Sequence, residues 1–189
     1  MSDSENLDSK IRSCTLCRLS SSRKRAVPGE GKIPAKIMLV GEAPGKNEDI
    51  EGRPFVGEAG KLLNQCLQQV GIERASVYIT NVVKCRPPNN RKPFPDEIKT
   101  CTDAYLFAQI SIVDPVVIVA LGVSAAEGLG LKFNRIKEVI GNHKLSISGK
   151  ERNVYVAYHP SFPLRFKSML PQFIEQLSEA KRILENETN

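Results

Sequence analysis

KIMLVGEAPG, residues 36–45, opens with an apolar run and ends in a glycine-rich loop, which is the pattern of a buried strand that leads into a loop. Apolar runs of the same kind recur at residues 77–80, 116–121 and 154–158. Between and after these runs, apolar residues at helical spacing predict helices at residues 62–70, 98–112, 124–129 and 170–184. Strands that alternate with helices predict an α/β fold in which helices cover both faces of a mostly parallel sheet.

The residues that directly follow the four predicted strands are candidates for a binding site. They are Gly41, Asn81, Gly122 and His159. The carboxyl ends of parallel strands meet at one edge of the sheet, and ligands of such sheets bind there. An Asn amide donates and accepts hydrogen bonds at the same time. We therefore expect Asn81 and His159 to contribute to one site at this edge.

Two glycine-containing loops suggest phosphate binding at first sight. Residues 40–49, VGEAPGKNED, fail the phosphate-loop pattern because only three residues separate Gly41 from Gly45 and because Asn47 stands where Ser or Thr is required. This disfavours hydrolysis of nucleoside triphosphates. Gly57 precedes a predicted helix, whose free N–H groups suit a phosphate, although an ordinary turn is the alternative interpretation.

Length and charge limit the class of protein. The chain has 189 residues, of which 41% are hydrophobic, and this predicts a single domain over residues 1–189. Lys and Arg exceed Asp and Glu by 27 to 21, which gives a net charge of +6. The basic residues gather at residues 18–36 and 84–92, so a polyanionic partner is favoured, while solvated loops without a ligand stay open as the other interpretation.

The N-terminal sequence MSDSENLDSK is polar and lacks the pattern of a secretory signal. The longest apolar run, at residues 116–121, is much shorter than the roughly 20 residues of a membrane span. We therefore expect a cytoplasmic protein, whose cysteines are metal ligands or buried thiols rather than disulfides.

Four of the five cysteines suggest a metal site. Cys14 and Cys17 form a C-x-x-C pair, Cys85 follows a predicted strand, and Cys101 lies on a predicted helix. Cys66 falls on the apolar stripe of its own helix, so we expect it to be a buried thiol and not a ligand. The spacing leaves zinc, an iron-sulfur cluster and free thiols open.

The loops and cysteines together resemble one known family, the family 4 uracil-DNA glycosylases of thermophilic bacteria and archaea. The resemblance extends from about Cys14 to Arg165. The matching motifs are C-x-x-C at 14–17, VPGEG at 27–31, GEAPG at 41–45, EGRPFVG at 51–57, TNVVKCRPPNNR at 80–91 and HPS at 159–161. The resemblance implies a three-layer αβα sandwich around a four-stranded sheet, and an enzyme that flips uracil out of DNA and hydrolyses its N-glycosidic bond, which initiates base excision repair.

The resemblance also implies roles for residues of a uracil pocket. Asn81 would bond O4 and N3 of uracil, Phe55 would stack on the base, and His159 would donate to O2 as charge develops there. Glu42 is the first candidate for positioning water. Ala43 stands where better-known uracil glycosylases carry an aspartate. The implied pocket is Gly41, Glu42, Ala43, Phe55, Asn81 and His159, with His159, Glu42 and Asn81 as the catalytic group.

For DNA binding, the resemblance implies that Gly57 and Ser161 contact phosphates. Phe162 or Leu164 would enter the space that the flipped base leaves, and Arg165 is a further candidate for a phosphate contact. A structural 4Fe-4S cluster would be bound by Cys14, Cys17, Cys85 and Cys101, and no catalytic metal is implied. The expected partner is uracil-containing DNA, single- or double-stranded, with a sliding clamp as a further candidate, and the expected state is a monomer.

Other functions are open at this point. The chain could prefer another damaged base, such as hypoxanthine or a mismatched thymine, although Asn81 favours uracil. It could also be a non-catalytic iron-sulfur module that binds DNA, but such a module has no use for the anion-stabilising His159. A zinc-bound structural adaptor is the third alternative.

Overall fold

The computed structural model describes residues 2–188 and has at its centre a mixed β-sheet. Four parallel strands form the middle of the sheet in the order β3-β2-β4-β6. They are β2 (Ile37–Gly41), β3 (Tyr78–Asn81), β4 (Val117–Leu121) and β6 (Lys150–Ala157). Within the described residues, the antiparallel strands β1 (Glu30–Gly31) and β5 (Gly141–Ile147) extend the sheet to six strands.

The four predicted strands are the four parallel strands, and the predicted α/β class is confirmed. The expected number of strands was too low because neither edge strand has an apolar run. β1 has two residues, and β5 reads GNHKLSI with side chains that alternate between half-buried and exposed until Ile147. A strand at an edge does not need the continuous apolar sequence of a strand buried on both faces.

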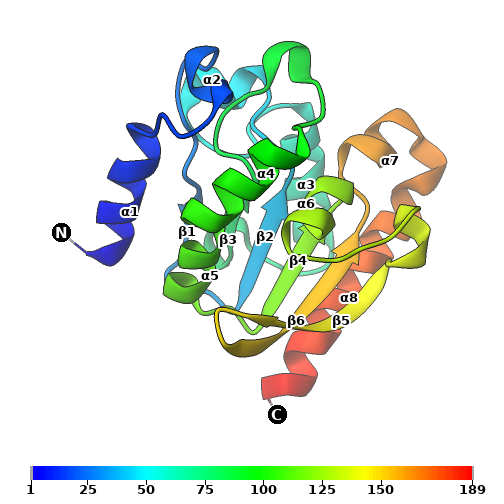
Figure 1. Cartoon of the computed structure of the whole chain (residues 1–189). Coiled ribbons are helices and arrows are strands. Elements are labelled where there is room, and N and C mark those ends of the chain that lie inside the picture. The colour runs from blue at the N-terminus through cyan, green and yellow to red at the C-terminus, as the bar shows by residue number, and fades with distance from the viewer. Residues whose placement is uncertain (1, 189) are drawn as a thin grey trace.

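Helices cover both faces of the sheet, as expected for a three-layer αβα sandwich (Figure 1). One face carries α1 (Asp3–Arg12), α4 (Pro95–Cys101), α5 (Phe107–Val113) and α6 (Val123–Gly128). The other face carries α3 (Glu58–Gln69), α7 (Ser161–Arg165) and α8 (Leu170–Thr188). The short helix α2 (Lys46–Glu51) lies at the carboxyl end of the sheet. In the described part of the chain, no helix is long and apolar enough to cross a membrane.

The helix expected at residues 98–112 is interrupted. α4 ends at Cys101, a π-helical turn spans Thr102–Leu106, and α5 follows directly. A π turn carries one extra residue per turn and changes the direction of the side chains on its two sides. Helices α1 and α2 were not predicted, because their polar sequences show little apolar spacing.

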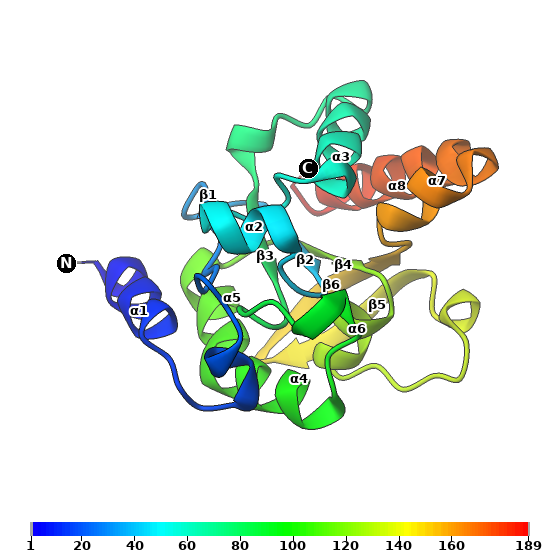
Figure 2. The same ribbon diagram turned by 90° about the horizontal axis from the view of Figure 1, so that it is seen from above.

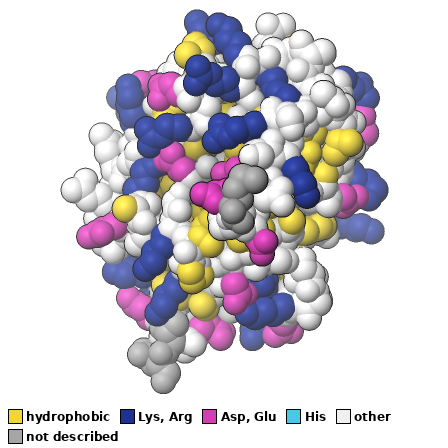
Figure 3. Space-filling view, turned by 90° about the vertical axis from the view of Figure 1, so that its left-hand side faces the viewer, with side chains coloured by type: hydrophobic (Ala, Val, Ile, Leu, Met, Phe, Trp, Pro, Cys, Tyr) yellow, Lys and Arg dark blue, Asp and Glu magenta, His cyan; other side chains and the backbone are white. Residues whose placement is uncertain are grey.

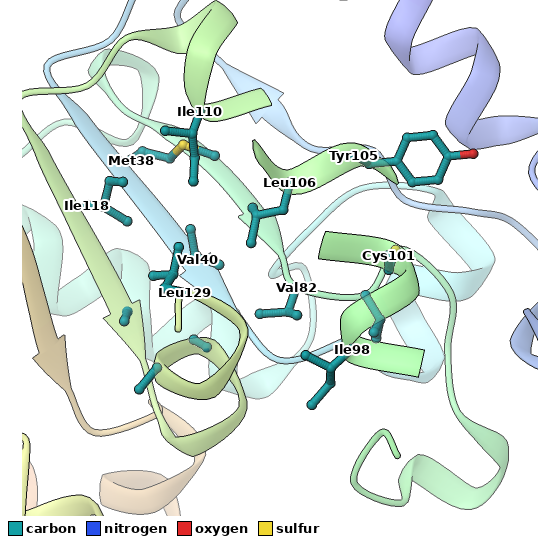
Figure 4. Close-up of a cluster of buried hydrophobic side chains, with 14 of the residues drawn as sticks. Met38, Val40, Val82, Ile98, Cys101, Tyr105, Leu106, Ile110, Ile118 and Leu129 are labelled. Atoms are coloured by element: carbon teal, nitrogen blue, oxygen red, sulfur yellow. The ribbon is translucent and has the colours of Figure 1, made fainter. Parts of the chain in front are cut away.

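Alternation of side chains along the central strands divides the core into two clusters. Met38 and Val40 of β2 point to the face of α4 and α5, whereas Ile37 and Leu39 point to the face of α3 and α8. Figure 4 shows part of the first cluster, in which Met38, Val40 and Ile118 of the sheet pack near Leu106 and Ile110. In the same view, Cys101 and Tyr105 lie at the outer end of the cluster.

All four parallel strands run toward the same edge, so the residues that follow them are neighbours in space. Figure 2 views the molecule from this edge and shows α2 and α6 beside the ends of the central strands. The fold therefore gathers the loops after β2, β3, β4 and β6 in one region.

Candidate active site and cysteine cavity

Gly41, Phe55 and Asn81 meet at the ends of β2 and β3. Gly41 is paired with Asn81 in the sheet. A Cβ atom at Gly41 would lie 2.4 Å from Asn81 Oδ1 and 2.5 Å from Phe55 Cζ, so only glycine leaves room for both side chains. His159, which follows β6, lies beside Phe55 with a distance of 5.9 Å between ring centroids. The structure thus brings together four of the residues expected to form one pocket.

The amide of Asn81 is buried and has no partner. Asn81 is 1% exposed, and neither Nδ2 nor Oδ1 forms a hydrogen bond with any residue that the structure describes. Leaving a buried polar group without a hydrogen bond costs about 1–3 kcal/mol. A side chain in this state has the donor and the acceptor needed for a ligand with a complementary edge.

The ring of His159 is held in one tautomer by Ser161. The backbone N–H of Ser161 donates to His159 Nδ1 at 3.2 Å, and Ser161 Oγ lies 2.7 Å from the same nitrogen. Because Nδ1 accepts the backbone N–H, the ring proton is on Nε2. Burial lowers the pKa of His159 to about 4, although Glu48 acts in the opposite direction. The ring is therefore neutral at pH 7 and presents one N–H donor.

The loop that carries Phe55 is held by the carboxylate of Glu48, a residue outside the predicted site. Phe55 has a φ of 52°, which is the left-handed region that a bulky residue rarely adopts. Glu48 Oε1 accepts from the N–H groups of Val56 at 2.9 Å and Gly57 at 2.7 Å, and Glu48 Oε2 accepts from the N–H of Gly45 at 3.1 Å. Glu48 thus joins the two loops on either side of α2.

Arg74 holds the same loop from the other side. Its Nη2 donates to the carbonyl of Pro54 at 2.7 Å and to Glu30 Oε1 at 2.6 Å, and its Nη1 donates to the carbonyl of Phe55 at 3.4 Å. The start of α3 also packs here, since a Cβ at Gly60 would lie 2.0 Å from the Phe55 carbonyl oxygen. The unfavourable backbone of Phe55 persists because these contacts surround it.

Glu42 is fixed by a residue of α6. The hydroxyl of Ser124, which is 1% exposed, donates to Glu42 Oε2 at 2.5 Å. Among the residues that the structure describes, the second carboxylate oxygen has no hydrogen-bond partner, while Ala43 next to it packs against the first core cluster. Glu42 therefore has a defined position at the edge where Asn81 lies.

The residues expected to bind DNA differ in their exposure and in whether their hydrogen-bond donors are free. Leu164 and Arg165 are exposed on α7, whereas Phe162 is half-buried in an aromatic stack with Tyr158 at 4.8 Å. The hydroxyl of Ser161 is taken by His159, which leaves no free donor for a phosphate. The N–H of Gly57 is taken by Glu48, so the free donors nearest to it are those of the first turn of α3.

One exposed aromatic residue in this region was not predicted. Phe166 follows α7 directly and is 50% exposed, and its ring lies 5.2 Å from that of Phe162. Its place beside the HPS loop was the only signal in the sequence.

The four expected ligand cysteines surround one cavity. Cys14, Cys17, Cys85 and Cys101 line one small cavity between the N-terminal segment and α4. Two N–H groups point at the sulfurs: Arg23 Nη1 donates to Cys85 Sγ at 3.1 Å, and the N–H of Leu16 donates to Cys14 Sγ at 3.5 Å. Cys66 lies apart from them in the second core cluster and is 2% exposed.

The described side chains do not form a compact site for a single metal ion. Within residues 2–188, no three side chains among His, Cys, Asp and Glu form a group that holds one metal ion. A zinc site needs four ligands within about 2.3 Å of one ion, whereas an iron-sulfur cluster spreads its cysteines over several irons. The shared cavity and the N–H groups directed at its sulfurs fit a group that is held by cysteine sulfurs.

Lys84 connects the cavity with the pocket. Its side chain is 1% exposed, and Nζ donates to Thr80 Oγ1 at 2.7 Å and to the carbonyl of Asn81 at 2.5 Å. Burial lowers the pKa of Lys84 to about 8, while negative charge on Cys101, Asp8 and Cys85 acts in the opposite direction. The end of β3 is therefore fixed from the side of the cysteines.

Comparisons with known proteins agree with these observations. The family model described as the uracil DNA glycosylase superfamily matches residues 28–183. A Type-4 uracil-DNA glycosylase of Thermotoga maritima is 44% identical over 187 residues, which cover 97% of this chain and 95% of the relative. A protein of the same name from Pyrobaculum aerophilum is 43% identical over 93% of this chain and 92% of the relative, and one from Sulfurisphaera tokodaii is 48% identical over 87% and 77%. Because the model and these relatives cover most of the chain, the chain belongs to the uracil DNA glycosylase superfamily.

Proposed function

We propose that this protein is a DNA glycosylase that removes uracil from DNA by hydrolysis of the N-glycosidic bond and so starts base excision repair. The names of its relatives support this activity. The observation that carries the proposal is the buried amide of Asn81, whose donor and acceptor both lack a partner among the described residues. Uracil presents a donor at N3 next to an acceptor at O4, and that edge would satisfy both amide atoms.

His159 stabilises the departing base in this proposal. As the bond to the sugar breaks, negative charge develops on uracil, and the Nε2–H of a neutral imidazole donates to its O2 atom. A donor whose bond strengthens in the transition state lowers the barrier itself. The contacts of Ser161 with Nδ1 support this role, because they direct the proton to Nε2.

Phe55 and Glu42 complete the pocket. The ring of Phe55 forms a face on which the base stacks, and its neighbour Gly41 gives the base access to Asn81. Glu42 orients the attacking water with the carboxylate oxygen that Ser124 leaves free. Bond cleavage has a cationic sugar in its transition state, by analogy with other glycosidic bonds, so a carboxylate at this position also stabilises the sugar.

For DNA binding, we propose that the first turn of α3 after Gly57 and the side chain of Arg165 contact phosphates, and that Leu164 enters the space left by the base. Leu164 is preferred to Phe162 because it is 44% exposed. Flipping costs a few kcal/mol of stacking and pairing, which an apolar side chain in the vacated space offsets in part.

We infer that Cys14, Cys17, Cys85 and Cys101 hold a 4Fe-4S cluster. When bound, the cluster supplies a cross-link between the N-terminal segment and the end of β3. Their shared cavity and the N–H groups of Arg23 and Leu16 directed at the sulfurs support a cluster of thiolates. A single-domain organisation, a cytoplasmic location, a monomeric state and a sliding clamp as partner stay predictions.

The test is an excision assay on oligonucleotides with one uracil opposite G, opposite A or in a single strand. Thymine and hypoxanthine substrates serve as matched controls. Asn81→Ala and His159→Ala are each expected to lower the single-turnover rate by about 10²-fold, since each removes one contact to the base. Tight binding of uracil DNA without cleavage by cluster-containing wild-type protein would favour the non-catalytic module instead.

A further inference from the structure

A short basic segment is fixed to the outside of α2 by a buried carboxylate. Asp49 is 2% exposed, and its Oδ1 accepts from the backbone N–H of Lys24 at 2.8 Å and of Arg25 at 3.2 Å. Hydrogen bonds from two consecutive N–H groups to one carboxylate fix the path of the backbone and leave the two side chains free.

The side chains of this segment have different surroundings. Arg23 turns toward the cysteine cavity, where it donates to Cys85 Sγ and to the carbonyl of Arg12. Lys24 and Arg25 are exposed, and within residues 2–188 their side chains have no carboxylate partner. The stem of Arg25 lies over the end of α2, since a Cβ at Gly52 would be 3.4 Å from Arg25 Cδ.

Two arginines outside this segment are neutralised instead. Arg18 forms ion pairs with Asp96 and Glu97, and Arg53 pairs with Glu30. Unpaired cations held close together repel each other, so their arrangement favours an anionic partner. Figure 3 faces the side of the molecule on which α1 lies, and Lys and Arg side chains gather over its upper part.

The segment is close to the pocket along α2. This helix starts directly after Gly45 of the pocket loop, and Asp49 lies three residues after Lys46, which is less than one helical turn. Lys46 is itself exposed and has no carboxylate partner in the described part of the chain. Lys46, Lys24 and Arg25 are therefore three exposed cations on or beside α2, a helix that Figure 2 shows next to the ends of the central strands.

We propose that Lys24 and Arg25 bind phosphates of the DNA strand beyond the flipped nucleotide, and that Asp49 is the residue that positions them. The partner is the sugar-phosphate backbone of DNA, because the site offers cations without any group that reads a base. This inference rests on the proposed excision of uracil only in that DNA is the substrate.

The test measures binding to a uracil-free duplex by fluorescence anisotropy over a range of KCl concentrations, so its outcome does not depend on excision. Each lost phosphate contact lowers the slope of log Kd against log salt by about 0.9. Lys24→Ala/Arg25→Ala is thus expected to lower the slope by about 1.8, and to bind less tightly at low salt. The matched control is Lys32→Ala/Lys36→Ala, which removes the same charge from exposed residues just before β2, at the opposite edge of the sheet.

Asp49→Ala separates positioning from overall charge. The substitution raises the net charge of the protein from +6 to +7, so general electrostatic attraction would strengthen DNA binding. Our proposal predicts the opposite, weaker binding with a smaller slope, because the two cations lose their fixed position. If this variant does not fold, as judged by circular dichroism, the Lys24→Ala/Arg25→Ala variant decides the question alone.

Three results would overturn the inference. They are an unchanged slope for Lys24→Ala/Arg25→Ala, an equal decrease in the control variant, and tighter DNA binding by a folded Asp49→Ala variant. If the wild-type protein does not excise uracil but its DNA binding depends on salt as expected, the proposed function is contradicted and this inference stands.

Discussion

Ser161 contacts the ring of His159, which is a different role from the phosphate contact expected from its motif. Its hydroxyl and its N–H both meet Nδ1 of His159, although the HPS motif suggested a phosphate contact. Ser161→Ala removes the hydroxyl and keeps the N–H. We expect kcat to fall by about 2- to 10-fold, the value of one ordinary hydrogen bond, with KM for DNA nearly unchanged.

Steady-state kinetics would check this prediction, with Ser178→Ala as the control. Ser178 lies on α8, where its hydroxyl donates to the carbonyl of Ile174. A higher KM at constant kcat in Ser161→Ala would instead favour the phosphate contact.

The protonation state of His159 predicts a particular pH dependence. Burial lowers its pKa to about 4, so the ring stays neutral throughout the range in which a free histidine titrates, near 6.5. The single-turnover rate of excision should therefore show no loss due to His159 between about pH 8 and pH 5. An acidic limb with a midpoint near 6.5, absent in His159→Ala, would contradict the assigned neutral tautomer.

At the scale of elements, the loop from Gly52 to Gly57 keeps its conformation through hydrogen bonds with two residues outside it, Arg74 and Glu48. Arg74 holds the carbonyl groups of Pro54 and Phe55, and Glu48 holds the N–H groups that follow. Arg74→Met keeps the apolar stem of the side chain and removes the guanidinium N–H groups that donate to the two carbonyls. We expect a lower excision rate by about 10-fold or more, because Phe55 no longer has one fixed orientation.

A matched variant makes this result specific. Arg53→Met also removes an arginine that pairs with Glu30, but the guanidinium of Arg53 donates to the Glu30 carboxylate and not to the carbonyl groups of Pro54 and Phe55. Its activity should stay near that of the wild type. An equal loss of excision rate in both variants would mean that activity depends on the ion pair with Glu30 and not on the hydrogen bonds to the loop carbonyls.

The cysteine cavity joins elements that are far apart in the chain. Cys85→Ser should remove the brown colour and the bound iron if the cluster is present. We then expect residues 13–23 to become sensitive to protease, because the cavity lies between this segment and α4. Cys66→Ser is the control, since this thiol lies in the other core cluster. Iron content and the mass of proteolytic fragments are the measurements.

Elements differ in how well their sequences predicted them. The central strands and α3 were found because their apolar residues are buried in continuous or helically spaced patterns. β5 was missed because an edge strand needs few apolar residues, and the π turn after Cys101 has no sequence pattern distinct from that of an α-helix. The sequence contains only a weak indication of the role of Glu48: it lies three residues after Gly45, at the position of a glutamate that caps a helix. Arg74 had none, because its contacts depend on the tertiary fold.

For the whole molecule, buried and paired acidic groups predict a loss of stability in acid. The hydrogen bonds of Arg91 lower the pKa of Glu97 below its usual 4.5, and those of Lys150 and Arg152 lower the pKa of Asp114. Such groups stabilise the fold above the pKa of the unfolded chain, and this contribution is lost as the pH falls. His159 acts in the same direction at a higher pH, because the unfolded chain takes up its proton below about 6.5 and the folded chain only near 4.

The free energy of unfolding should thus decrease in two stages, first from about pH 6.5 to pH 4 and then more steeply below about pH 4.5. Urea denaturation at a series of pH values would measure both stages. His159→Gln removes the titrating ring and should flatten the first stage. A wild-type profile that is flat down to pH 4.5 would show that the ring is more accessible to protons than its surroundings imply.

The two edges of the sheet bear on how copies of this protein behave toward each other. An unpaired strand edge is a place where a second chain can add a strand, and proteins block such edges with short strands or charged side chains. β1 is only two residues long, and β5 carries Lys144 in an ion pair with Glu151 of β6. Self-association through strand addition is disfavoured at both ends of the sheet, so any dimer that forms at high concentration would have to use its helices or loops.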